Sequence, residues 1–166
     1  MRILILGNSN IFQRKVYKAL SRIKKIKIEL ASKSPNTNNL KLEKFYNSYE
    51  EALKETSAKI VYISLINSKH FTWAIKCLDA NKHIIVDKPL ALNFTQTQKI
   101  LNLASKKKLL VSEAIVFDKH AQFKNMYKKI DLNHPTKIYS SFHIPKLDKK
   151  NFRNYKGYGG GCFQDM

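Results

Sequence analysis

The chain has 166 residues, enough for one ordinary domain with a sizeable core, and its formal net charge is +19. No apolar run reaches the roughly 18 residues that a membrane span requires, so we expect a cytoplasmic protein without a membrane partner. The two cysteines, Cys77 and Cys162, suggest free thiols rather than a disulfide framework. No pair of Cys or His residues has the spacing of metal ligands, so we expect no metal site.

The positive charge raises nucleic-acid binding as one possible function, because cations attract phosphate backbones. Only four of the 31 basic residues are arginine, however, and arginine is the residue whose bidentate fork reads base edges. The lysines are scattered over predicted helix faces and turns. We therefore expect no nucleic-acid partner, although the charge favours an anionic substrate.

The amino-terminal sequence predicts a strand over residues 2–6, a turn at Gly7 and a helix over about residues 10–22. In a dinucleotide-binding fold this turn carries G-x-G-x-x-G, whose positions here are Gly7, Ser9 and Phe12. Phe12 departs from the pattern, because glycine there lets the helix pack closely on the strand. Alone, this partial fingerprint fits an ordinary strand-to-helix turn equally well. If the turn and helix start bind a pyrophosphate, the candidate residues are Gly7, Asn8, Ser9, Asn10 and Ile11.

A second strand is predicted over residues 26–31, followed by Ser32 and Lys33. An acidic residue usually ends this strand and binds the adenosine ribose of NAD. Glu29 lies two or three residues too early for that role. A hydroxyl and an ammonium at this place could hold the 2′-phosphate of NADP instead, and the alternative is that Lys33 is an ordinary surface lysine. We therefore expect NADP in preference to NAD.

The middle of the chain predicts a βαβ unit. A short strand over residues 43–46 and a helix that Ser48 caps lead into an apolar run over 60–66, typical of a strand covered on both faces. A helix capped by Asn67 or Ser68 follows and ends near Asn81, which tolerates left-handed backbone angles. The next strand, residues 83–86, runs into Lys88, which is thereby placed at the carboxyl edge of a parallel sheet. That edge is where open α/β sheets bind their ligands.

After residue 92 the pattern continues with another helix, capped by Asn93 or Thr95 and ending at residues 106–108. Residues 109–117 are expected to form the last parallel strand. A helix over about residues 119–130 should close the domain by burying Phe123, Tyr127 and Ile130. Residues 137–144 alternate loosely, which is typical of the first strand of an antiparallel sheet.

The βαβ unit resembles the glucose–fructose oxidoreductase, inositol dehydrogenase and MocA-type family (Gfo/Idh/MocA). Members usually carry Asn-x-x-His, a helix, Ala-Gly-Lys-His, a strand and then Glu-Lys-Pro-Leu-Ala. Asn67 and His70 match the first motif, and Asp87 and Asn81 replace the usual Glu and Gly. The full set of matching segments is Asn67, His70, residues 80–83 and residues 87–91.

Two later segments extend the resemblance. Residues 113–120 resemble a family segment that ends in aromatic-Arg-x-His, with Asp118 where Arg is common. His120 is then either a substrate contact or simply a polar residue at a helix start. Gly159–Gly161 and Asp165 fit the family's Gly-Gly-Gly and Asp motif, whose following His would fall beyond Met166.

The resemblance implies an α/β fold, a Rossmann-type doubly wound parallel sheet with only the start of a second, antiparallel α+β domain. Residues 1–133 would be the NAD(P)-binding domain, and residues 134–166 the truncated start of the substrate domain. The match corresponds to roughly the first half of an ordinary member. A homo-oligomer is possible if a partner chain supplies the missing sheet.

The implied activity is hydride transfer between NADP or NAD and a hydroxyl or ketone of a sugar, cyclitol or nucleotide sugar. Lys88 would hydrogen-bond the reacting oxygen, and Asp165 would orient both the sugar hydroxyls and the lysine. The alternative is a catalytically incompetent nucleotide-binding fragment or remnant of such an enzyme. The remaining candidate residues are Leu65, Asn67, His70, Asp87 and Lys88 for the cofactor, and Lys88, His120 and Asp165 for the substrate.

Overall fold

Six short parallel strands form one sheet in the computed structural model of the chain, which describes residues 1–34, 40–130, 133, 137, 139–141 and 143–161. The strand order is β3-β2-β1-β4-β5-β6, so the chain winds one way from β1 and the other way from β4. This doubly wound order confirms the predicted Rossmann-type fold. The strands are β1 (Arg2–Leu6), β2 (Lys27–Ala31), β3 (Lys44–Tyr46), β4 (Ile60–Ile63), β5 (His83–Val86) and β6 (Val111–Glu113).

The register brings the carboxyl ends of the central strands level with one another. Leu6 at the end of β1 pairs with Ala31 at the end of β2 and with Ile63 at the end of β4. Ile63 in turn pairs with Val86 at the end of β5. The four segments that follow these strands therefore leave the sheet along one edge, and the strand order reverses between β1 and β4 at that edge.

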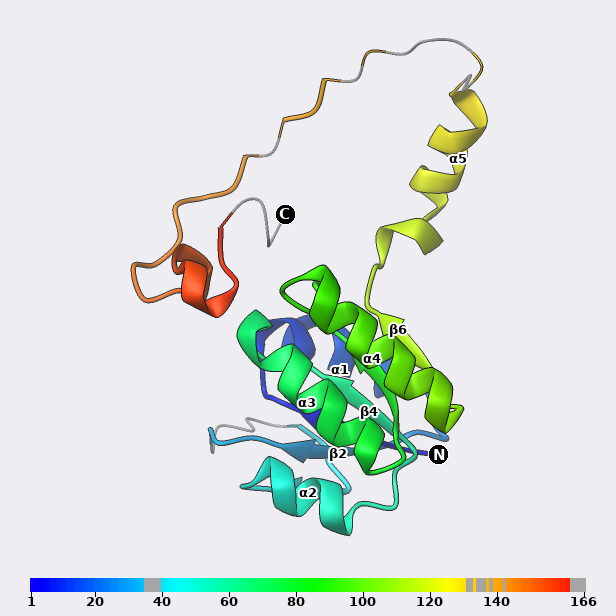
Figure 1. The fold of residues 1–166 in the computed structure, drawn as a ribbon, viewed down its shortest axis with the longest axis vertical. Helices are drawn as coiled ribbons and strands as arrows, with labels where there is room; N and C mark the ends of the chain where they lie inside the picture. Colours follow the sequence, from blue (N-terminus) through cyan, green and yellow to red (C-terminus); the bar gives the residue numbers. More distant parts are fainter. Residues whose placement is uncertain (35–39, 131–132, 134–136, 138, 142, 162–166) are drawn as a thin grey trace.

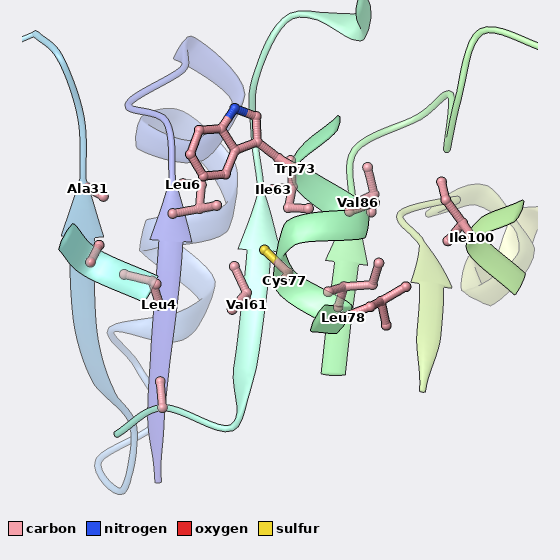
Figure 2. Close-up of a cluster of buried hydrophobic side chains, with 14 of the residues drawn as sticks. Leu4, Leu6, Ala31, Val61, Ile63, Trp73, Cys77, Leu78, Val86 and Ile100 are labelled. Atoms are coloured by element: carbon pink, nitrogen blue, oxygen red, sulfur yellow. The ribbon is translucent and has the colours of Figure 1, made fainter. Parts of the chain in front are cut away.

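Helices cover the sheet in two groups. The larger core lies between one face of the sheet and the helices α2, α3 and α4 (Figure 1). Alternate residues of a strand point to the same face of the sheet, so Leu4 and Leu6 of β1 share this face with Val61 and Ile63 of β4. Figure 2 shows them packed beneath the α3 side chains Trp73, Cys77 and Leu78. The helices are a π-helical turn (Phe12–Val16) that continues into α1 (Tyr17–Leu20), and α2 (Tyr49–Glu55), α3 (Asn67–Asp79), α4 (Phe94–Lys107) and α5 (Ala121–Lys129).

The opposite face of the sheet packs against the first helix. Phe12 is fully buried there among Ile3, Ile5, Leu30 and Tyr62. A glycine at this position would let the helix approach the strand, whereas the phenyl ring fills the space between them. The departure from G-x-G-x-x-G therefore changes how the helix packs, and the sheet topology is kept.

Most helix ends follow the sequence. The Ser48 hydroxyl accepts from the N–H of Glu51, and Asn93 Oδ1 accepts from Gln96 N–H at 3.0 Å, so both predicted N-caps are confirmed. Asn81 has the expected left-handed backbone, with φ of +55°. The predicted cap of α3 is wrong, because Ile66 is the N-cap and no side chain caps this helix.

The region after β5 differs most from the sequence expectation. The strand predicted over residues 109–117 is only β6, and a 3₁₀ turn (Phe117–Lys119) precedes α5. The prediction that this helix buries Phe123, Tyr127 and Ile130 is wrong, because no α5 residue is buried, Tyr127 is 56% exposed and Ile130 is only half-buried. Its rings pack on each other instead, with Phe123 5.3 Å from Phe117 and 5.7 Å from Tyr127 between ring centroids, and Figure 1 shows α5 apart from the sheet.

The antiparallel strand predicted over residues 137–144 is absent from the part of that range that the structure describes, which leaves out residues 138 and 142. A lone strand has no neighbour to take its hydrogen bonds. Two 3₁₀ turns follow, Phe152–Asn154 and Lys156–Tyr158.

No helix within the described ranges has the length and apolar character needed to cross a membrane.

Candidate functional site

The turn after β1 lies tightly against the segment after β4. Gly7 has a φ of +100°, and its N–H donates to the Ala31 carbonyl at 2.9 Å. A Cβ placed on Gly7 would lie 2.3 Å from the Ser64 carbonyl oxygen. Both the backbone angle and the lack of space require glycine here, so this first position of the predicted fingerprint has a clear structural reason.

Ser9, at the second position of the fingerprint, links the first helix to the segment after β4. Its Oγ accepts from Phe12 N–H at 3.0 Å and lies 2.7 Å from the Ser64 Oγ. The Ser64 hydroxyl donates to Asp87 Oδ2 at 2.6 Å, and because a hydroxyl has a single hydrogen, Ser9 must donate to Ser64. A directed series of hydrogen bonds therefore runs from the start of the first helix to Asp87.

Asp87 is held from two sides. Its Oδ2 accepts from Ser64, and its Oδ1 accepts from the Tyr62 hydroxyl. Burial raises the pKa of the Tyr62 phenol well above its usual range, and the hydrogen bond and charge of Asp87 raise it further. Tyr62 is therefore a protonated donor across the ordinary pH range, and it fixes the carboxylate that precedes Lys88.

Residues 87–90, which we call the lysine turn, are anchored by two further contacts. Pro89 follows Lys88 through a cis peptide bond, and the Pro89 carbonyl oxygen lies 2.7 Å from His70 Nδ1. The other ring nitrogen of His70 lies 3.0 Å from the Leu65 carbonyl oxygen. Leu90 N–H donates to Glu113 Oε1 at 2.9 Å. The turn is therefore fixed to α3 and β6, while the Lys88 side chain is exposed.

His70 is fully buried between the two carbonyl groups. A neutral imidazole carries one N–H and donates to only one of them, whereas the charged form donates to both. The ring therefore acts on the lysine turn through the backbone. The predicted contact between His70 and a cofactor stays a prediction.

The glycine-rich segment reaches the same edge of the sheet. Asn67 Nδ2 donates to the Gly159 carbonyl at 2.8 Å, and Gly159 has a φ of +79°. A Cβ on Gly159 would lie 2.4 Å from Leu92 Cδ2. Asp165, the catalytic candidate that follows this segment, lies outside the described residues.

His120 is used at the start of α5. Its Nδ1 accepts from Gln122 N–H at 3.2 Å, which makes it the N-cap of that helix. This is the role of a polar residue at a helix start that the sequence offered as an alternative. A contact between His120 and substrate stays a prediction.

A cavity of about 470 Å³ opens beside the Gly7 turn. We call it the lysine-lined cavity. Ser32 does not line it, since this residue is 3% exposed and its hydroxyl accepts from Ser34 N–H at 3.0 Å. Glu29 does not line it either, since this residue is 4% exposed and accepts from Thr56 Oγ1 at 2.5 Å. The lining includes Lys33 after β2, Leu65 and Ile66 after β4, and Lys69, Trp73 and Lys76 on α3.

The α3 residues of this cavity were not predicted from the sequence. Lys69, Trp73 and Lys76 recur at intervals of four and three residues, which places them on one face of a helix. That spacing, on the helix after the central strand, was the available signal.

The carboxyl edge of the sheet combines exposed ammonium groups, a tight glycine turn and a helix start, all of which suit an anionic ligand such as a dinucleotide. Within the described part of the chain, no group of three or more His, Cys, Asp or Glu residues is placed to hold a metal ion.

Comparisons with known proteins agree with this arrangement. Residues 1–115 match a family model, GFO_IDH_MocA, described as an oxidoreductase family with an NAD-binding Rossmann fold. An uncharacterized oxidoreductase of Rhizobium meliloti, ORF334, is 29% identical over 124 residues, which are 73% of this chain and 37% of that protein. A dTDP-3,4-didehydro-2,6-dideoxy-alpha-D-glucose 3-reductase of Saccharopolyspora spinosa is 25% identical over 178 residues, covering 100% of this chain and 52% of that protein.

Among solved structures, the 3-ketoreductase KijD10 of Actinomadura kijaniata, in complex with NADP and TDP-benzene, superposes with a TM-score of 0.88 at 25% identity. That match covers 100% of this chain and 54% of KijD10. The chain spans about half the length or less of the curated relatives named here. With its doubly wound sheet, its glycine turn and its lysine turn, the chain belongs to the Gfo/Idh/MocA oxidoreductase family and carries that family's NAD-binding Rossmann fold.

Proposed function

We propose that this chain is the cofactor-binding part of an NADP- or NAD-dependent oxidoreductase. The reaction is hydride transfer between the nicotinamide cofactor and a hydroxyl or ketone of a sugar, cyclitol or nucleotide sugar. The observation that carries the proposal is the position of Lys88, on an anchored turn at the edge where the Gly7 turn also leaves the sheet. The reductase of S. spinosa and KijD10 support a nucleotide-sugar substrate.

The residues present fit a dinucleotide. The Gly7 turn admits no Cβ, and the backbone of residues 8–11 at the start of the first helix would hold the pyrophosphate. The lysine-lined cavity next to it would take the adenosine end, where Lys33 favours NADP. Leu65, Asn67 and the lysine turn would lie along the nicotinamide end. NADP in the KijD10 complex supports the same preference.

The chemistry of this chain depends on Lys88. A bound nicotinamide cofactor supplies or accepts the hydride, so the substrate oxygen must gain or lose a proton in the same reaction. The exposed Lys88 ammonium donates a hydrogen bond to that oxygen and stabilises its negative charge. Asp87, held by Tyr62 and Ser64, keeps the turn in place, and Asp165 would orient the substrate hydroxyls. Residues 1–133 would form the cofactor domain, and residues 134–166 would form the start of the substrate domain.

A fluorescence titration of the purified chain with NADPH and with NADH tests the proposal. We expect a Kd on the order of micromolar for NADPH, with weaker binding of NADH. Absence of binding by both would contradict the proposed function. Binding without turnover on any sugar-type substrate would instead favour a nucleotide-binding fragment that lacks catalytic competence.

A further inference from the structure

The lysine-lined cavity contains more positive charge than its own acidic residues balance. It adjoins the Gly7 turn, because a Cβ on Gly7 would lie 2.7 Å from Leu65 Cδ2 and Leu65 lines the cavity. Three lysines and one glutamate are among the lining residues. The charge balance of these four side chains decides which ligand the cavity suits.

Lys76 and Glu50 neutralise each other. The Lys76 Nζ donates to Glu50 Oε1 at 2.7 Å and lies 4.3 Å from the centre of the Trp73 ring. This hydrogen bond lowers the pKa of Glu50, so the carboxyl is ionised at neutral pH. The pair contributes no net charge to the cavity.

Lys33 and Lys69 are different. Both side chains are exposed, and within the described residues neither ammonium group forms a hydrogen bond or an ion pair. They approach the cavity from two separate elements, the segment after β2 and the first turn of α3. The start of a helix adds a favourable field for an anion at Lys69. The cavity therefore presents two unbalanced positive charges.

We propose that Lys69, together with Lys33, binds the 2′-phosphate of NADP and that Lys69 determines the preference for NADP over NAD. This assignment rests on the proposed function and names the residue that selects the cofactor. A phosphate monoester carries a charge of about −1.5 to −2 at neutral pH, which matches two ammonium groups. Lys69 takes the part that the sequence had given to Ser32, whose hydroxyl accepts from Ser34 N–H and lies outside the cavity lining.

The test measures the Kd of NADPH and of NADH for the wild-type chain and for Lys69→Gln. We expect Lys69→Gln to weaken NADPH binding by about 5- to 20-fold, because one charge contact to phosphate is lost. NADH binding should change by less than about twofold, since NADH has no 2′-phosphate and the exposed side chain supports no other contact. Lys69→Arg keeps the charge and should keep most of the preference.

Lys99→Gln is the matched control. Lys99 is an exposed residue of α4 outside the cavity lining, and its substitution changes the net charge by the same amount. It should alter neither Kd by more than about twofold. Urea unfolding of each variant verifies that the fold is unchanged.

The outcomes separate the two proposals. If the wild-type chain binds neither nucleotide, both the proposed function and the Lys69 assignment are overturned. If it binds NADPH and NADH but Lys69→Gln leaves the ratio of the two Kd values unchanged, only the Lys69 assignment is overturned. That outcome includes equal weakening of NADPH and NADH, because the effect of Lys69→Gln would then not depend on the 2′-phosphate.

Discussion

The lysine turn and the lysine-lined cavity lie along the same edge of the sheet but are built in opposite ways. In the lysine turn, Asp87, Pro89 and Leu90 are tied by hydrogen bonds to β4, α3 and β6. In the cavity, Lys33 and Lys69 are exposed side chains that lack such ties among the described residues. The protein therefore fixes the position of the backbone in the lysine turn. In the lysine-lined cavity it provides positive charge that the described residues do not balance.

This difference separates two kinds of contribution. A group that acts on a reacting atom needs a fixed position, because a small displacement weakens its effect on the transition state. A group that binds a charged ligand needs mainly an unbalanced charge. Substitutions in the lysine turn should therefore affect turnover and stability, whereas substitutions in the cavity should affect nucleotide affinity alone.

The largest effect is expected for Lys88→Gln. Turnover with any sugar-type substrate that the protein accepts should fall by about 10²- to 10⁴-fold, because the substrate oxygen would lose the cationic hydrogen-bond donor that we propose for it. Steady-state kinetics measure this loss. The Kd of NADPH should change by less than about threefold. A large loss of nucleotide affinity without loss of turnover would contradict the assignment of turnover to the lysine turn.

His70→Leu should lower the free energy of unfolding by about 2–4 kcal/mol, because at least one of the carbonyl groups of Pro89 and Leu65 loses its buried hydrogen-bond donor. Urea unfolding followed by circular dichroism measures the change. Lys69→Gln, at the neighbouring position on the same helix, should change stability by less than about 0.5 kcal/mol. Similar losses for both variants would show that the two ends of the site are not built differently.

Ser64→Ala removes the donor to Asp87 and the acceptor for Ser9. A loss of about 1–3 kcal/mol in the free energy of unfolding is expected, since a hydrogen bond to a carboxylate is broken in a part-buried site. Ser21→Ala, on an exposed hydroxyl that donates to the Lys18 carbonyl, is the control and should cost much less. Equal costs would indicate that the series of bonds to Asp87 has no special weight.

The smallest effect is a pH dependence carried by Tyr62. Its folded-state pKa is raised by burial and by Asp87, so the phenol stays protonated in the fold while the unfolded chain releases this proton above about pH 10. The associated stability is complete below that pH and decreases as the pH rises above it. Unfolding measured at pH 9 and at pH 11 should show a smaller decrease for Tyr62→Phe than for the wild type. Tyr127→Phe, at an exposed position, should behave as the wild type.

Sequence reasoning predicted the sheet well because its signals were local. The apolar runs marked the central strands. Ser48 and Asn93 marked helix starts through the capping bonds of their side chains, and Asn81 marked a helix end through its tolerance of left-handed backbone angles. The cap of α3 was wrong because the side chain of Asn67 bonds to Gly159, which lies 92 residues away in the chain. The burial of Tyr127 was wrong because periodicity gives an apolar face but not what covers it.

Of the candidate site, only positions fixed by strand ends could be placed from the sequence. Gly7 and Lys88 could be placed at the sheet edge because strand ends fix their position. The partners of Asp87 and His70 come from other elements, so only the fold reveals them. Lys69 was missed because its spacing with Trp73 and Lys76 marks one face of a helix but does not show that a cavity opens on that face.

The central claim is that the carboxyl edge of this sheet binds a nicotinamide dinucleotide. An NMR titration of the ¹⁵N-labelled chain with NADPH tests it most directly. We predict chemical-shift changes at Gly7, Ser9, Lys33 and Lys69. Changes confined to the opposite edge, where Met1, Lys59 and His83 line a separate cavity of about 610 Å³, or no changes at all, would contradict the claim.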